Sequence, residues 1–432
     1  MSVDMTPDDF SLLLRRERRR RASFVSSPGG KLEPSIPALG AIADAIAGSP
    51  DFHAHEGVFL EIGRATGALL SATLHRTIRG QAAGGVRHWH YPTLRELVRD
   101  GLRLSRGMGR KNALAGLWWG GGKGVIARSA DGRYLDPAYR AALYEDYGRF
   151  VTSLRGAYVT AEDVGTTPPD MAAIFRTTRF VTCVPPGVGG SGNPSPSTAK
   201  GVVCAIEAAL DHLGLGTVSG KRFALHGAGN VGAALIGELV AKGAARIVAT
   251  EVDAAQSAAV RARFTGAPVE VRHVPAGDLS IFAEECDVLS PSALGGVLDA
   301  ETIPRLRCKV VCGAANNQLV EEGRDDQALL ERRITFIPDF VASRMGIVNC
   351  ANEQYGSLPD DPAILRHFGR TWENAVYVVT RRVLEGADRE QVTTTAAATS
   401  LADELSLVPH PLFPHRSAAL VKALVDEGWE AG

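Results

Sequence analysis

Short apolar runs and longer stretches with helical spacing alternate through the second half of the chain. The apolar runs predict strands; between residues 222 and 340 they read RFALHG, ARIVATE, EVRHV, CDVLSP, KVVCGAA and ITFIPDF. Strands that alternate with helices predict a parallel sheet with helices on both faces.

The first half has a different order of elements. We expect strands at 57–62, 67–77 and 157–165 and helices at 93–116 and 137–154. The first helix is supported by apolar positions near helical spacing, namely Leu94, Leu97, Val98, Leu102 and Leu104. We interpret the glycine-rich stretch AGLWWGGGKGVI (115–126) as containing a loop. This part therefore predicts a second α/β domain.

A Gly/Pro/Ser-rich stretch near residue 185 separates the two patterns. We expect two α/β domains, over 51–184 and 185–375, with a cleft between them. The helices of 376–432 are expected to pack back on the first domain. Residues 1–50 read as a basic leader and linker with poor order.

Charge and hydropathy exclude several classes of protein. The 432 residues hold 47 Lys plus Arg and 48 Asp plus Glu, so nucleic acid is not an expected partner. No stretch is apolar enough to span a membrane, and the N-terminus lacks the apolar core of a secretory signal. The leader does carry an arginine run, Arg15, Arg16 and Arg18 to Arg21. It could be an arm that binds nucleic acid or docks a partner, but we favour a solvated helix or a frayed terminus.

The six cysteines form no C-x-x-C pair and have no histidine at metal-ligand spacing. We expect them to be reduced, to bind no metal and to pack as small apolar residues in a cytoplasmic protein.

The clearest motif for ligand binding is KRFALHGAGNVGAALIGELVAKGAARIVATEVD (221–253), a strand, a glycine turn, a helix and a second strand. Gly227 permits the tight turn, Gly229 lets a pyrophosphate approach the backbone, and Gly232 lets the helix pack closely on the strand. Asn230 and Val231 begin the helix, whose free N–H groups would bind the phosphates. The motif predicts a dinucleotide site.

The second strand of this motif ends at an acid, Glu251. A carboxylate at this place binds the ribose 2′-hydroxyl and repels a 2′-phosphate, which predicts NAD rather than NADP. Asp253 is the competing candidate. Residues 185–375 are therefore expected to form a Rossmann-type NAD-binding domain.

Lys123 follows three glycines, and Lys111 lies twelve residues earlier. The residue after Lys123 is Gly124, not Ser or Thr, so the stretch is not a phosphate-binding P-loop. Two buried lysines would depress each other's pKa toward the range of a useful base, and Asp163 is a plausible counter-charge. Such a set would suit oxidation of an amino acid at its Cα–N bond, although both lysines could equally be ordinary solvated residues.

Five motifs in order carry a family resemblance: GMGRKNALAGLWWGGGKGVI, TAEDVGTTPPDM, GVGGSGNPSPSTAKGV, HGAGNVG and GAANNQL. Together they resemble the glutamate, leucine, phenylalanine and valine dehydrogenases, and most of all the leucine/phenylalanine branch. The resemblance implies that Lys111 binds the substrate α-carboxylate, Lys123 is the catalytic base and Asp163 handles protons at the amine. It also implies a substrate (dimerisation) domain over 51–184, a homo-oligomer, and cofactor contacts from Ala315, Asn316 and Ser343.

The stretch GQAAGGVR resembles a family segment in which glutamate dehydrogenases place a side-chain-binding lysine before the Gly-Gly pair. Ala83 stands there, followed by Gly84, so an acidic substrate side chain would lose hydration without a partner. Ala161, Ile347 and Cys350 match other pocket positions of the family. The resemblance therefore implies a branched-chain or aromatic amino acid and its 2-oxo acid as substrates.

The chain departs from the family at FVASRMGIVN (340–349). Ser343 stands in place of an asparagine, and Arg344 and Met345 replace small residues. The main hypothesis is an NAD-dependent dehydrogenase that deaminates an apolar L-amino acid reversibly. The alternative is a catalytically impaired protein of the same fold that binds NAD or an amino acid.

Overall fold

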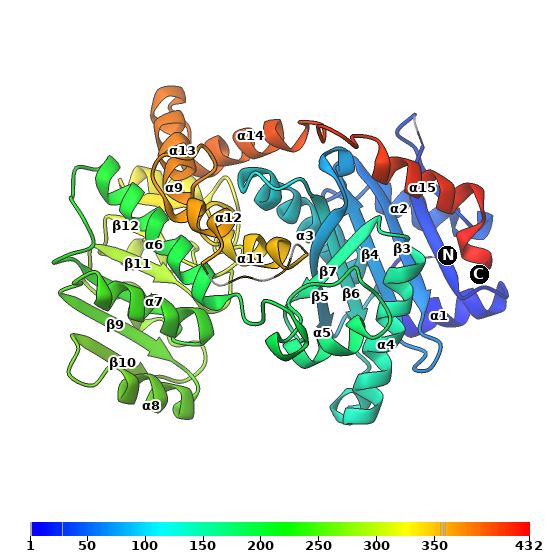
Figure 1. Ribbon diagram of the computed structural model, residues 1–432, viewed down its shortest axis with the longest axis horizontal. Coiled ribbons are helices and arrows are strands. Elements are labelled where there is room, and N and C mark those ends of the chain that lie inside the picture. The colour runs from blue at the N-terminus through cyan, green and yellow to red at the C-terminus, as the bar shows by residue number, and fades with distance from the viewer. Residues whose placement is uncertain (1, 28, 355, 357, 359) are drawn as a thin grey trace. The chain divides into compact units, whose positions relative to one another are not determined.

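The computed structural model describes residues 2–27, 29–354, 356, 358 and 360–432. The chain divides into two compact units. Unit 1 comprises Met1–Asn193, Cys350–Ser357 and Asp403–Gly432, and unit 2 comprises Pro194–Asn349 and Leu358–Ala402. Each unit contains its own sheet flanked by helices (Figure 1), which confirms the α/β fold class with two domains.

Unit 1 is built on a mixed seven-stranded sheet in the order β2-β1-β3-β4-β6-β5-β7. Its strands are β1 (Arg21–Ser26), β2 (Leu32–Pro34), β3 (His55–Ile62), β4 (Leu69–His75), β5 (Ala82–Trp89), β6 (Gly120–Ala127) and β7 (Tyr158–Glu162). Its helices are α1 (Pro7–Arg16), α2 (Gly40–Ala47), α3 (Leu94–Leu114), α4 (Pro137–Ser153), α5 (Pro168–Phe175) and α15 (Arg416–Asp426).

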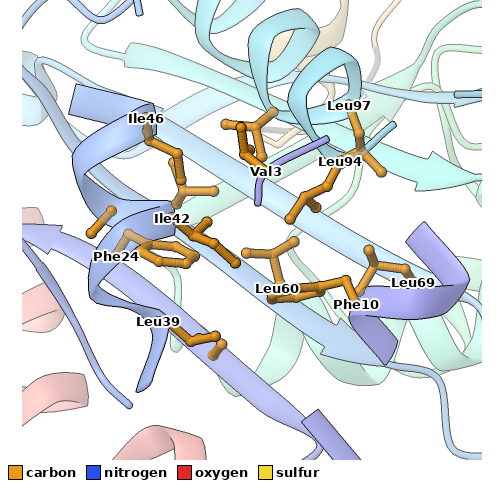
Figure 2. Close-up of a cluster of buried hydrophobic side chains, with 14 of the residues drawn as sticks. Val3, Phe10, Phe24, Leu39, Ile42, Ile46, Leu60, Leu69, Leu94 and Leu97 are labelled. Carbon is orange, nitrogen blue, oxygen red and sulfur yellow. The ribbon is translucent and has the colours of Figure 1, made fainter. Parts of the chain in front are cut away.

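One hydrophobic cluster of unit 1 lies where α1, α2 and α3 meet the sheet. Figure 2 shows Phe10, Ile42, Leu60 and Leu94 from four different elements pointing toward one another. Capping boxes start α1 at Thr6 and α3 at Thr93. Each threonine side chain accepts from the N3 backbone N–H, and the N3 carboxylate accepts from the backbone N–H of the threonine.

The prediction of a poorly ordered leader over residues 1–50 was wrong. The apolar face of α1 buries Phe10 and Leu14 completely, and β1 pairs with both β2 and β3. Two arginines of the basic run, Arg20 and Arg21, form ion pairs with the buried Glu61. The leader is thus part of the sheet and its core.

Unit 2 holds a six-stranded sheet in the order β10-β9-β8-β11-β12-β13, and every strand pair is parallel. Its strands are β8 (Arg222–His226), β9 (Arg246–Glu251), β10 (Val269–His273), β11 (Val288–Pro291), β12 (Val310–Cys312) and β13 (Thr335–Ile337). Its helices are α6 (Ser195–His212), α7 (Asn230–Ala241), α8 (Ala254–Arg263), α9 (Asp325–Glu331), α10 (Asp339–Ala342), α12 (Pro362–Leu365) and α13 (Val376–Glu390). The parallel sheet predicted from the apolar runs is confirmed.

Two further helices, α11 (Met345–Glu353) and α14 (Thr394–Ser406), contain residues of both units. The expectation that all of 376–432 packs on the first domain was wrong for its first part. Helix α13 packs against α6, so residues up to Ala402 belong to unit 2, and only Asp403–Gly432 belongs to unit 1. Among the described residues, none of the helices combines the length and the low polarity that crossing a membrane requires.

Candidate active site

The sequence predicted a loop in the stretch around Lys123, and this prediction was wrong. The stretch forms strand β6 inside the sheet of unit 1. It pairs antiparallel with β4 and parallel with β5. The glycines make this possible: a Cβ added to Gly121 would lie 2.2 Å from the Ser105 carbonyl oxygen of α3, and one on Gly124 would overlap the Tyr147 hydroxyl. Neighbouring backbone and a tyrosine therefore occupy the space that side chains would fill.

Lys123 is buried, with 3% of its surface exposed, and contacts a carboxylate directly. Its Nζ lies 2.8 Å from Oδ2 of Asp163, just beyond the end of β7. The structure thus brings together two of the predicted catalytic residues, which come from different strands of one sheet.

Asp163 has a second cationic partner, because Nε of Arg87 donates to the same Oδ2 at 3.0 Å. Burial alone would raise the pKa of Asp163, but the charges of Lys123 and Arg87 outweigh it and lower the pKa to about 2. Asp163 is therefore held as a carboxylate at neutral pH.

Sequence reasoning missed the residues that hold Arg87. Its Nη1 donates to Asp100 of α3 at 3.1 Å, and the Tyr91 hydroxyl donates to the same carboxylate at 2.6 Å. A chain of hydrogen bonds thus runs from Tyr91 through Asp100 and Arg87 to Asp163. Arg87 ends the GQAAGGVR stretch, so its place in the motif was the available signal.

Lys111 lies half-buried in the last turn of α3. This helix packs on β6, because a Cβ on Gly121 would also lie 2.9 Å from the Gly109 backbone nitrogen. Lys111 and Lys123 are thus on adjacent packed elements of unit 1.

The predicted pocket residues of unit 1 are small and buried. Ala83 on β5 pairs with Gly121 of β6 and Val159 of β7 and is 1% exposed. Gly84 follows it, and Ala161 on β7 is 5% exposed. Cys350 lies on α11 with 3% exposure, three residues after Ile347, which belongs to unit 2. None of these side chains offers a charge.

In unit 2 the glycine motif forms the turn from β8 into α7. Gly227 has a φ of +101°, which favours glycine, and a Cβ on Gly232 would lie 2.2 Å from the Gly227 carbonyl oxygen. Gly229 is the N-cap of α7, and a Cβ added there meets nothing within 4 Å. Asn230 and Val231 form the first turn of α7. The start of α7 is therefore open to a ligand at Gly229, whereas Gly227 and Gly232 are close-packed. This glycine turn fits a dinucleotide pyrophosphate.

The two candidate acids at the end of β9 differ in their contacts. Glu251 accepts from the backbone N–H of Ala228 in the glycine turn at 3.0 Å, and also from Val252 and Asp253. Asp253 is instead the N-cap of α8 and accepts from the Gln256 N–H at 2.8 Å. The Glu251 carboxylate is therefore fixed beside the glycine turn.

The remaining cofactor candidates also lie in unit 2. Ala315 and Asn316 follow β12, with Ala315 buried and Asn316 exposed. Ser343 is the C-cap of α10, and its Oγ donates to the Asp339 carbonyl at 2.8 Å.

Arg344 and Met345 are two of the three residues that depart from the family pattern. Both are fully buried in unit 2. Nη2 of Arg344 donates to the Asn374 carbonyl at 2.7 Å, and burial lowers the pKa of Arg344 to about 9. Met345 packs on α6, because a Cβ on Gly201 would lie 2.7 Å from the Met345 Cγ. The Arg344 and Met345 side chains thus pack inside unit 2.

The chain is similar to known proteins over most of its length. Residues 70–180 match the family model for the Glu/Leu/Phe/Val dehydrogenase dimerisation domain, and residues 189–403 match the model for Glutamate/Leucine/Phenylalanine/Valine dehydrogenase. The chain is 37% identical over 334 residues to a leucine dehydrogenase of Geobacillus stearothermophilus, covering 77% of this chain and 85% of that one. It is 38% identical over 353 residues to a valine dehydrogenase of Streptomyces albus, covering 81% and 92%.

A solved structure, the L-tryptophan dehydrogenase from Nostoc punctiforme, is also similar. It has a TM-score of 0.66 and 32% sequence identity, over 82% of this chain and 96% of that one.

Proposed function

This chain belongs to the glutamate/leucine/phenylalanine/valine dehydrogenase family, and we propose that its substrate is a branched-chain or aromatic L-amino acid, which it deaminates reversibly to the 2-oxo acid and ammonia. The observation that carries the assignment is the buried Lys123–Asp163 pair, with Nζ and Oδ2 2.8 Å apart. The relatives named for leucine, valine and tryptophan support an apolar substrate.

In this proposal Lys123 takes a proton from the water that attacks the imine carbon and returns it in the reverse direction. Asp163 exchanges a proton with the substrate nitrogen, and Arg87 keeps its carboxylate oriented. Lys111 binds the α-carboxylate. Each role matches a group that can hold or move a proton, or a charge that can pair with the substrate.

The cofactor is a nicotinamide dinucleotide, and we propose NAD. Hydride transfer to and from the substrate Cα is the chemistry that such a cofactor would supply when bound. Gly227, Gly229, Asn230, Val231 and Gly232 would hold its pyrophosphate, and Glu251 its ribose; further contacts would come from Ala315, Asn316 and Ser343. The Glu251 carboxylate beside the glycine turn would repel a 2′-phosphate, which supports NAD over NADP.

Ala83 and Ala161 support the choice of an apolar side chain. Both are nearly inaccessible and uncharged, so a substrate carboxylate placed against them would lose hydration without a compensating partner. Ile347 and Cys350 would add further apolar lining. The description of residues 70–180 as a dimerisation domain supports a homo-oligomer.

The alternative, a catalytically impaired protein that binds NAD or an amino acid, rests on the departure at Ser343, Arg344 and Met345. The burial of the Arg344 and Met345 side chains in unit 2, together with the intact Lys123–Asp163 pair, favours the enzyme instead.

The test is NADH absorbance during reductive amination, with ammonia and a panel of branched, aromatic, indolic and glutamate-type 2-oxo acids. We expect turnover with an apolar member of the panel. Lys123→Ala should lower kcat/KM by about 10²–10⁴-fold, the usual worth of a general base. The matched control is Lys422→Ala, at an exposed lysine of α15. Absence of turnover with every oxo acid, in a protein that still binds NAD, would favour the binding protein.

A further inference from the structure

Two buried thiols of unit 1 lie in contact although they are 167 residues apart in the chain. The Sγ atoms of Cys183 and Cys350 are 2.7 Å apart, and the two residues are 1% and 3% exposed. A disulfide bond is about 2.05 Å long, so the sulfur atoms would need to move by less than the length of one bond to be joined.

Contacts that do not involve sulfur hold the two cysteines together. Glu353, one helical turn after Cys350 on α11, accepts from the backbone N–H of Cys183 at 2.9 Å and of Val184 at 3.1 Å. The same carboxylate accepts from the backbone N–H and the hydroxyl of Ser191. Both ends of segment 183–191 are therefore bonded to the Glu353 carboxylate. These hydrogen bonds hold the Cys183 thiol against that of Cys350.

The other cysteines provide internal comparisons. Cys204 is half-buried, and its Sγ faces the Phe368 carbonyl at 3.8 Å. The Cys286 thiol interacts with that of Cys308 in unit 2, which makes a second neighbouring pair. Any general oxidation of the protein would reach these residues as well.

We propose that Cys183 and Cys350 form an oxidisable dithiol that a small hydroperoxide closes to an intramolecular disulfide. One thiol attacks the peroxide, which yields a sulfenic acid and releases the alcohol, or water from hydrogen peroxide. The second thiol then displaces water from the sulfenic sulfur, and the S–S bond forms. Two thiol hydrogens are lost, two electrons pass to the peroxide, and a dithiol reductant reverses the change.

The setting of the pair determines which oxidants act and how quickly. Because both thiols are buried, a small peroxide reaches them more readily than a bulky disulfide. The contact with Cys183 and burial raise the pKa of the Cys350 thiol well above its ordinary value. Oxidation is therefore slow near neutral pH and faster at alkaline pH, since the thiolate is the attacking species.

The bond would affect catalysis through Cys350, a step that rests on the proposed function because Cys350 is there a pocket residue. Joining Cys350 to segment 183–191 removes a thiol from the pocket wall and stiffens α11 at this point. We expect the KM for the apolar amino acid to rise several-fold in the oxidised protein.

The experiment uses the reduced full-length protein, treated with hydrogen peroxide at pH 8, unfolded in guanidinium with N-ethylmaleimide and mapped by mass spectrometry. We expect the peptides of Cys183 and Cys350 to appear joined, with the mass of two hydrogen atoms lost and restored by dithiothreitol. Cys183→Ser should abolish the joined peptide, and Cys204→Ser should leave it unchanged.

The proposal is overturned if Cys183 and Cys350 are both recovered alkylated while the Cys286–Cys308 pair has been oxidised. Because the cross-link is read by mass alone, it is tested even if the protein turns over no oxo acid. An unchanged KM in fully cross-linked protein overturns the effect on the pocket, and peroxide-treated Cys183→Ser is the control for that measurement.

Discussion

A single carboxylate oxygen, Oδ2 of Asp163, accepts from both Lys123 and Arg87. The pKa of Asp163 is lowered in the folded protein, to about 2. Its contribution to stability, about 2 kcal/mol, is therefore present above the unfolded pKa near 4 and is lost as the pH falls through 2. The pair stabilises unit 1 throughout the range in which the enzyme would work.

Arg87 offers a test of how Asp163 is held. Arg87→Met keeps the length of the side chain and removes one of the two charges on Asp163. The pKa of Asp163 should rise, so the acid limb of the kcat/KM profile should move to higher pH by about 1 unit or more.

Arg99→Met is the control, because Arg99 is exposed on the same helix as Asp100 and pairs with Asp51. An unshifted acid limb in Arg87→Met would show that Arg87 does not control the charge of Asp163.

Glu162, the neighbour of Asp163, has the opposite behaviour. Its Oε2 is buried without a hydrogen-bond partner among the described residues, and burial, followed by the charges of Asp170 and Asp163, raises its pKa to about 7. A raised pKa contributes stability below the unfolded value, near 4.5, that is lost as the pH rises through 7. Glu162→Gln should therefore be more stable than the wild type at pH 8, with a smaller gain at pH 5, in urea unfolding.

Glu145→Gln is the matched control, since Glu145 is paired with Arg149 and Arg176 at the surface of unit 1. Equal gains for Glu162→Gln at both pH values would contradict the prediction.

Lys123 and Asp163 could be found from the sequence because each lies in a glycine-flanked motif of distinctive composition. Arg87, Asp100 and Tyr91 could not be joined in advance. Their contact depends on how β5 and α3 are placed in the folded unit, and nothing in their spacing shows that two carboxylates share one guanidinium.

At the scale of elements, β6 shows why composition misled the sequence analysis. Three glycines in succession are typical of a loop, because glycine weakens a strand. In unit 1 the loss is offset by close packing: α3 approaches Gly121, and Tyr147 approaches Gly124. The strand can form here only because its glycines have no side chains, and this is visible only once the elements packed against β6 are known.

This packing predicts the effect of Gly121→Ala. The added Cβ would lie 2.2 Å from the Ser105 carbonyl oxygen, which is fixed backbone of α3. We expect a loss of about 1–3 kcal/mol or more, typical of overpacking, measured by urea unfolding.

The control is Gly107→Ala on α3, the helix that packs on Gly121; a Cβ added at Gly107 meets nothing within 4 Å. Alanine should raise helix stability there by about 0.5–1 kcal/mol. Equal effects of the two substitutions would mean that close packing does not explain the glycines of β6.

At the scale of the whole molecule, the two halves were predictable to different degrees. The presence of β8 to β13 along the chain was predictable from the sequence because each strand is a local apolar run. The place of the first fifty residues was not, because α1 and β1 are stabilised by strands and helices far along the chain.

A truncation separates the two views of the leader. Removing residues 1–30 deletes α1 and β1 and takes Phe10, Leu14 and Phe24 out of the core. The loss of each large buried side chain costs about 2–5 kcal/mol, so unit 1 should lose its cooperative unfolding transition. Circular dichroism during thermal unfolding measures this loss. Full-length protein with Arg15, Arg16 and Arg18 changed to Ala should stay within about 1 kcal/mol of the wild type. An unchanged transition in the truncated chain would show that the leader is dispensable.

The close packing of β6 also limits how this protein could be redesigned. Libraries that diversify Gly121, Gly122 or Gly124 would mostly yield misfolded variants, because backbone or tyrosine atoms already occupy those directions. Directed evolution toward a new amino acid should instead sample Ala83 and Ala161, the proposed substrate-binding positions of unit 1. The strand that carries Lys123, the proposed catalytic base, therefore has little freedom to accept side chains at its glycines.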